Sequence, residues 1–195
     1  SLLPEWLTSF AGAISAVLSL FERRFATGLL AASSAYEATH GIATGLGSTP
    51  LIDPLLSSAN FCMAHDLAVY RVEKTARLAH LPVVWKHLRV CWEGKDLSTN
   101  CGRCEKCLRQ MLCMLACGIT DFSAFSSPLT LAQVLAAPPP KSLTLENWKR
   151  CYAHAVERGL GRQELFVAMK QLIDRAQPPG GAKTSRPWWR SLWGG

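Results

Sequence analysis

Four cysteines near the middle of the chain constrain its fold more than any other sequence feature. Cys91, Cys101, Cys104 and Cys107 have nine, two and two residues between successive members. Thiolates at these spacings can converge on one cation, and Zn²⁺ takes four sulfur ligands at the corners of a tetrahedron. Gly102 permits a tight turn between the second and third cysteines. The spacing therefore predicts a closed, structural zinc site in which protein fills all four positions.

Two other interpretations of the four cysteines stay open. Two-residue spacings also occur among the cysteines that bind iron–sulfur clusters, although no proline follows Cys107 here. Alternatively, the four residues are free thiols that are merely close in sequence. The basic residues Arg103, Lys106 and Arg109 would offset the negative charge of four thiolates, which favours a bound metal ion.

The cysteine content and the hydropathy pattern indicate a reducing compartment. Eight cysteines suit a disulfide scaffold only in a short, exported chain, and Glu5 stands where a signal peptide would be basic. No segment reaches the roughly 18–20 apolar residues that a membrane-spanning helix needs. We therefore expect a cytoplasmic protein with no membrane partner. The cysteines outside the cluster are expected to be small core residues: Cys62, Cys113, Cys117 and Cys151.

Helix-like and strand-like patterns alternate over the first two thirds of the chain. The expected helices cover 5–22, 68–80 and 108–117, the last ending at Gly118, and the expected strands cover 27–33, 61–65 and 88–92. This alternation predicts an α/β fold with a partial, Rossmann-like layer of parallel strands. A Gly/Ser/Thr-rich loop over 34–50 separates the first two strands, and loops of this length are often functional.

Three regions are expected along the chain. Residues 1–127 form part of an α/β domain that includes the zinc loop 91–107, residues 128–177 form a helical extension, and residues 178–195 form a disordered basic tail. Two surface helices are expected in the extension, over 145–158 and 162–175, with Thr144 as the N-cap of the first.

The net charge of +7 is concentrated at one end of the chain. Residues 141–195 carry ten Lys and Arg against four Asp and Glu, so they account for +6 of the total. An anionic partner such as nucleic acid would therefore meet this end first. The basic C-terminal helices are the only sequence feature that supports such a partner.

Two sequence segments carry a resemblance to a known family. Cys91-Trp92, followed by Asn100-Cys-Gly-Arg-Cys-Glu-Lys-Cys-Leu-Arg109, resembles the zinc-binding C-terminal half of 7-cyano-7-deazaguanine synthase-like proteins. The segment Ser48-Thr-Pro-Leu-Ile-Asp-Pro-Leu55 resembles the part of those proteins that precedes the zinc loop. These proteins belong to the PP-loop ATP pyrophosphatases, which have the adenine nucleotide alpha-hydrolase fold. The resemblance spans roughly residues 27–120.

The resemblance implies a reaction and its cofactors. Members of the family use ATP and Mg²⁺ to adenylate a carboxylate, and a nitrogen nucleophile then captures the acyl group. They cradle the phosphates in a Ser-Gly-Gly-x-Asp-Ser loop, which does not occur in this sequence. Since the chain also begins at Ser1 in the middle of a pattern, we expect it to be the C-terminal part of a longer protein. The chain alone is not expected to hydrolyse ATP.

Five residues are candidates for contact with a substrate or its phosphates, and none is assigned a catalytic role: Asp53, His65, Asp66, Lys74 and Arg109. Each also has a plain structural interpretation, such as a turn aspartate, a helix cap or a counter-charge to the metal. His65 and Asp66 end an expected strand, where ligand sites of α/β proteins gather. Two hypotheses follow: part of an ATP-dependent, ligase-like enzyme that binds a small-molecule substrate, or a non-catalytic, zinc-stapled binding module, possibly for nucleic acid.

Overall fold

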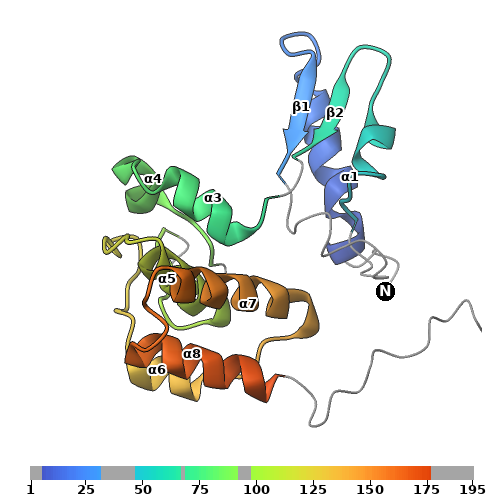
Figure 1. Ribbon diagram of the computed structural model, residues 1–195. Coiled ribbons are helices and arrows are strands. Elements are labelled where there is room, and N and C mark those ends of the chain that lie inside the picture. The colour runs from blue at the N-terminus through green and yellow to red at the C-terminus, as the bar shows by residue number, and fades with distance from the viewer. Residues whose placement is uncertain (1–5, 32–46, 67–68, 92–97, 177–195) are drawn as a thin grey trace, which may run out of the picture. The chain divides into compact units, whose positions relative to one another are not determined.

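The computed structural model describes residues 6–31, 47–66, 69–91 and 98–176 (Figure 1). Within these residues the protein is α/β, with seven α-helices, one short 3₁₀ helix and a two-stranded parallel sheet. The chain divides into two compact units, residues 1–74 and residues 75–195. The division falls inside helix α3 (Arg71–Leu78), and each unit is treated separately below.

A parallel strand pair forms the centre of the first unit. Strand β1 (Thr27–Leu30) pairs with β2 (Cys62–His65), so that Leu30 lies opposite His65. The predicted parallel pairing is thus confirmed, but a wider Rossmann-like layer is not seen in the described residues. Helix α1 (Trp6–Ser19) packs against β1, and the 3₁₀ helix η1 (Asp53–Leu56) packs against β2.

The core of this unit is small and lies on one face of the sheet. It contains Ala11 of α1, Leu30 of β1, and Phe61 and Met63 in or next to β2. On the opposite face, Cys62 is exposed, so its prediction as a core residue is wrong. The alternation of side chains along a strand explains this, because Met63 takes the buried face and Cys62 must take the other.

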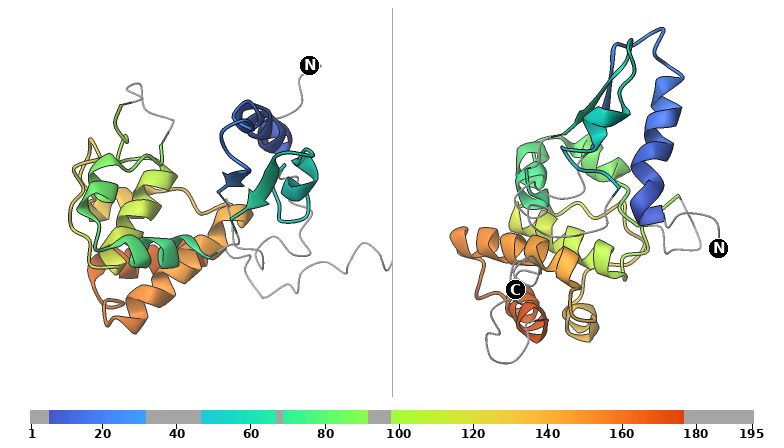
Figure 2. Two further views of the ribbon diagram at one scale, coloured as in Figure 1. Left: turned by 90° about the horizontal axis from the view of Figure 1, so that it is seen from above. Right: turned by 90° about the vertical axis from the view of Figure 1, so that its right-hand side faces the viewer.

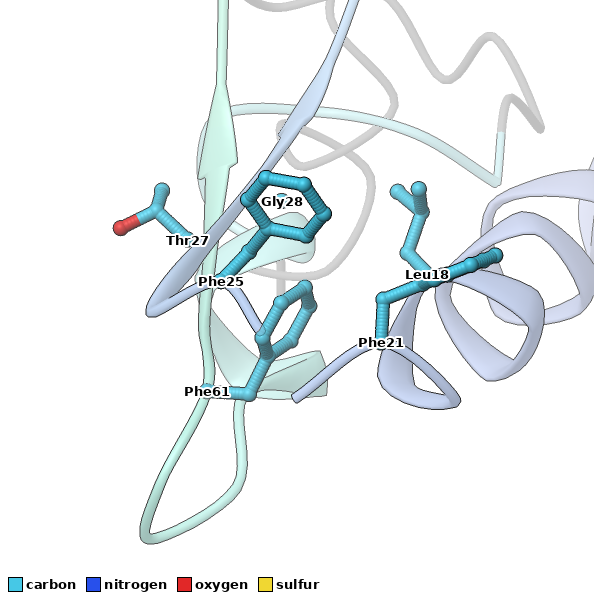
Figure 3. A pocket seen from close by; sticks show the side chains of 6 residues that line it. All are labelled: Leu18, Phe21, Phe25, Thr27, Gly28 and Phe61. Carbon is cyan, nitrogen blue, oxygen red and sulfur yellow. The ribbon is translucent and has the colours of Figure 1, made fainter. Parts of the chain in front are cut away.

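An apolar groove lies at the amino ends of the two strands (Figure 3). Its lining comes from the end of α1, the start of β1 and the residue before β2: Leu18, Phe21, Phe25, Thr27, Gly28 and Phe61. A Cβ atom at Gly28 would lie 2.8 Å from the ring of Phe61, so any larger residue here would force that ring to move. The groove therefore depends on a strand residue without a side chain.

Four helices build the core of the second unit (Figures 1 and 2). Helix α5 (Glu105–Ala116) packs against α7 (Ser142–Glu157), which packs against α8 (Glu164–Arg175), and α8 also covers α6 (Leu131–Ala136). Their fully buried side chains include Met111, Leu112, Met114, Trp148, Phe166, Met169 and Leu172. The helices predicted over 145–158 and 162–175 are confirmed as α7 and α8, and the three-residue spacing of Phe166, Met169 and Leu172 gives α8 a buried face.

The ends of these helices follow local chemistry. Gly118 has φ +81 directly after α5, which confirms its predicted role as the terminating residue. Thr130 and Gln133 form a capping box at the start of α6. The prediction that Thr144 caps the next helix is wrong, because α7 begins earlier and the Thr144 hydroxyl donates to the carbonyl oxygen of Lys141.

The strand predicted over 88–92 is absent from the described residues 88–91, and Trp92 lies outside them. The reason is that these backbone groups bond to a side chain: the amides of Val90 and Cys91 donate to Asn100. Just before this segment lies a helix that we did not predict, α4 (Pro82–His87). Proline at its first position was the available signal.

Two further predictions concern residues outside the described part of the chain: the tail 178–195 and most of the loop 34–50. Among the described residues, no helix combines the length and hydropathy needed to cross a bilayer.

Candidate metal centre and polar cluster

The sulfur atoms of the four predicted ligands meet at one point in the second unit. Adjacent sulfurs are 3.4 Å apart for Cys91 and Cys101, 3.5 Å for Cys104 and Cys107, 3.6 Å for Cys91 and Cys104, and 3.8 Å for Cys101 and Cys107. All four lie within 4.8 Å of one another, and none forms a disulfide. The prediction that these residues can hold a metal ion is confirmed.

The spacing of the sulfurs fits one ion. A tetrahedral ion with metal–sulfur bonds of about 2.3 Å holds its sulfurs about 3.8 Å apart, close to the separations observed here. A polynuclear iron–sulfur cluster places several metal atoms between its ligands and so needs a wider set of thiolates. The geometry therefore favours a mononuclear centre.

Asn100 holds the two halves of the centre together. Its side chain is fully buried and makes four hydrogen bonds. Oδ1 accepts from the amides of Val90 and Cys91 at 2.9 and 3.1 Å, and Nδ2 donates to the carbonyl oxygens of Leu88 and Ala124 at 2.7 and 2.8 Å. One amide group thus fixes the first ligand beside the other three.

The turn that carries Cys101 and Cys104 requires a glycine. Gly102 has φ +70, and a Cβ atom there would overlap the carbonyl oxygen of Ser127. Within this turn, the amides of Arg103 and Cys104 point at the Cys101 sulfur, at 3.5 and 3.4 Å. Such amides stabilise a thiolate, because they place partial positive charge beside it.

Without a metal ion, the thiols of Cys104 and Cys107 hold their protons. Burial raises the pKa of Cys104 to about 11, although the amide of Cys107 donates to its sulfur. Burial also raises the pKa of Cys107, with the amide of Gly102 acting against this effect. A cation that binds here must displace these protons, so metal affinity depends on pH.

The predicted phosphate contact Arg109 lies in this unit, on α5. Its side chain is buried, and Nη1 lies 3.1 Å from Oε1 of Glu105, one turn earlier on the same helix. The same Glu105 oxygen accepts a hydrogen bond of 2.7 Å from the indole of Trp148 on α7. The guanidinium therefore belongs to a buried network that joins the start of α5 to α7.

The other four candidates lie in the first unit, where two of them are in direct contact. The Asp53 carboxylate is fully buried, and its Oδ2 lies 2.6 Å from Nδ1 of His65. The same oxygen accepts from the Ser48 hydroxyl at 2.8 Å, and Oδ1 accepts from the amide of Thr49 at 3.2 Å. Because η1 packs on β2, a residue of a tight turn reaches the carboxyl end of the strand.

The remaining two candidates form an ion pair at the same end of β2. Lys74 Nζ lies 2.7 Å from Oδ2 of Asp66, and both side chains are about a third exposed, at 32% and 38%. The hydrogen bond from Lys74 holds the pKa of Asp66 below its ordinary value. The four candidates of this unit thus form two pairs, each of one acidic and one basic side chain: Asp53 with His65, and Asp66 with Lys74.

Two residues that organise these sites were not assigned a role from the sequence. Asn100 is the residue directly before the cysteine turn, and a single sequence carries no signal that marks a polar side chain as buried. Ser48 precedes the Pro-rich segment, where a serine in a turn usually bonds to its own backbone. The hydrogen-bond partners of the Asn100 side chain lie 9 to 24 residues away in the sequence, and Ser48 bonds to the side chain of Asp53 only because the chain turns between them.

Comparison of the chain with protein-family models, with curated proteins and with solved structures finds no match.

Proposed function

We propose that the four cysteines bind a structural Zn²⁺ and that the chain is the C-terminal part of a PP-loop ATP pyrophosphatase-like enzyme. The observation that carries the zinc assignment is the set of four sulfur atoms at 3.4–3.8 Å along neighbouring edges. With four protein ligands, the ion has no open position for substrate or water. Its role is to fix the segment 88–91 to the start of α5.

Two features support the enzymatic part of the proposal. The first is the order of motifs, with the Pro-Leu-Ile-Asp segment before the single cysteine and the three clustered cysteines after it. The second is the polar cluster at the carboxyl ends of β1 and β2, since ligands of parallel α/β sheets bind at this edge. His65, Asp66 and Lys74 would contact the substrate there, and the fully buried Asp53 would hold the ring of His65.

The metal assignment is tested by measuring the metal content of purified protein. We expect about one zinc ion per chain and no visible absorption. A brown protein that contains iron and acid-labile sulfide would contradict it. Cys104→Ser should lose the ion, while Cys62→Ser, which changes an exposed thiol, should retain it.

The enzymatic assignment is tested on the reading frame that encodes the chain. We expect the frame to continue upstream into a strand followed by Ser-Gly-Gly-x-Asp-Ser, and the longer protein to exchange pyrophosphate with ATP in the presence of Mg²⁺. A start codon directly upstream with no such loop would overturn the assignment and leave a zinc-stapled binding module.

Nucleic acid is the partner that such a module would be tested for first. The described basic residues offer it little, because several are paired within their own helices: Arg150 with Glu146 at 2.9 Å and Lys170 with Asp174 at 2.6 Å. A shift in a low-salt binding assay that disappears as ionic strength rises would favour the module.

A further inference from the structure

The contact between Asp53 and His65 fixes which nitrogen of the imidazole carries a proton. Asp53 accepts a hydrogen bond on each of its oxygens, from the Ser48 hydroxyl on Oδ2 and from the Thr49 amide on Oδ1. The group facing it at 2.6 Å, Nδ1 of His65, must then be a donor. In the neutral ring, Nε2 is therefore the nitrogen with a free electron pair.

The second nitrogen of the imidazole differs from the first in its contacts. No described residue makes a hydrogen bond to Nε2 of His65, whereas Nδ1 is held firmly on the buried carboxylate. The side chain is only 6% exposed, so the ring is held in one orientation by its surroundings. A histidine oriented in this way by a buried aspartate is the arrangement that proton acceptors use in acyl-transfer enzymes.

The position of His65 agrees with such a role. It is the last residue of β2 and lies opposite Leu30, the last residue of β1, so it stands at the carboxyl edge of the sheet. The pair Asp66 and Lys74 lies beside it. Lys74 is partly exposed and adjacent to the ring's own strand, which places a cation near any anionic group that a ligand brings to this edge.

We propose that His65 accepts the proton of the nitrogen nucleophile and that Asp53 is its positioning residue. This inference rests on the proposed function and names one step of it. The amine nitrogen attacks the carbonyl carbon of the acyl adenylate and forms the new C–N bond. The bond from that carbon to the phosphate oxygen breaks, and its electron pair leaves with AMP. The proton released from nitrogen passes to Nε2.

The step can be tested apart from ATP, because the acyl adenylate can be supplied ready-made. The zinc-loaded longer protein, encoded by the extended reading frame, is mixed with benzoyl adenylate and ammonia, and benzamide is measured against time. We expect acceleration over the uncatalysed reaction, and we expect His65→Gln to lose about 100-fold or more of it, the usual contribution of a general base. His80→Gln, which changes an exposed histidine in a turn, should leave the rate unchanged.

The outcomes separate the two proposals. A longer wild-type protein that does not accelerate the reaction overturns the proposed capture of an acyl adenylate, and this inference falls with it. A longer wild-type protein that does so, with its His65→Gln variant equally fast and equally stable to heat, overturns the inference alone.

A spectroscopic measurement tests the geometry even if a variant fails to fold. In ¹⁵N-labelled wild-type protein at neutral pH, the neutral His65 ring should show a protonated Nδ1 and an unprotonated Nε2. Asp53→Asn should abolish this fixed tautomer and lower kcat with little change in KM for the adenylate. A wild-type ring protonated at Nε2 instead would exclude the proposed role.

Discussion

At the scale of single residues, the side chain of Asn100 makes the backbone hydrogen bonds that a neighbouring strand would otherwise make to the segment 88–91. The segment 88–91 has the apolar composition of a strand, but its polar backbone groups bond to one amide side chain instead of to a second backbone. The backbone of Asn100 bonds to residues after α5: its N–H donates to the carbonyl oxygen of Ala124, and its carbonyl oxygen accepts from the N–H of Ser126. The metal ligands on both sides of it thereby share one support.

Removal of this side chain should weaken both fold and metal binding. Asn100→Ala leaves the amides of Val90 and Cys91 and the carbonyl oxygen of Leu88 without their partner, and each buried orphan costs roughly 1–3 kcal/mol. We expect the free energy of unfolding of the zinc-loaded protein to fall by about 3 kcal/mol or more, with metal affinity about 10–100-fold lower. Denaturant unfolding and competition with a chromophoric chelator measure the two effects. Asn60→Ala, at an exposed position, is the matched control and should change neither.

The raised pKa values of the ligand thiols give metal binding a defined pH dependence. Since the pKa of Cys104 is about 11 and that of Cys107 is also raised, both bind as thiolates only after they lose a proton. Lower pH opposes this loss, so zinc affinity should fall at least about 100-fold for each unit of pH below 7, tenfold for each proton released. Calorimetry in buffers of different ionisation enthalpy counts the protons. Release of fewer than two would contradict the burial of these thiols.

At the scale of elements, two glycines with positive φ, Gly102 and Gly159, differ in what surrounds them. Gly102 and Gly159 have nearly the same φ, +70 and +75, but a Cβ atom at Gly102 would overlap Ser127, and at Gly159 it would meet nothing within 4 Å. Gly159→Ala should therefore cost only the strain of the left-handed region, about 1–2 kcal/mol.

Gly102→Ala should cost more than Gly159→Ala and should also weaken zinc binding, because the turn must open to admit the methyl group. Thermal melts of the zinc-loaded variants and their metal content provide the comparison. Equal losses in the two variants would show that the contact with Ser127 has no energetic weight.

The same scale shows what the sequence predicts and what it does not. Local signals were sufficient for α5 and its glycine stop at Gly118, for the parallel strands and for the four ligands, because spacing and periodicity carry each of them. The prediction of a strand over 88–92 was wrong, because the backbone of this segment bonds to a side chain rather than to another strand. The prediction of an N-cap at Thr144 was wrong, because the threonine hydroxyl donates to an earlier carbonyl oxygen instead of accepting from a later amide. The capping box that does form, at Thr130, depends on its partner Gln133.

At the scale of the whole molecule, the two units should respond differently to loss of metal. The cysteine ligands and α5 lie in the second unit, whereas the core of the first unit is formed by α1 and the strand pair. Treatment with a chelator should increase hydrogen exchange at residues 98–117 and leave residues 62–65 unchanged. Mass spectrometry of peptic peptides resolves the two segments. An equal increase in both would mean that the units unfold together.

The bond between Trp148 and Glu105 gives the molecule a built-in optical reporter. Glu105 follows the ligand Cys104 directly, and its carboxylate holds the indole of a fully buried tryptophan at 2.7 Å. An indole emits at a wavelength and intensity set by its local field and by quenchers nearby. Movement of the ligand turn is thus transmitted to a chromophore through one hydrogen bond. The intensity of tryptophan fluorescence should follow the filling of the metal site in real time, with no label attached, and Trp148→Phe should reduce that signal.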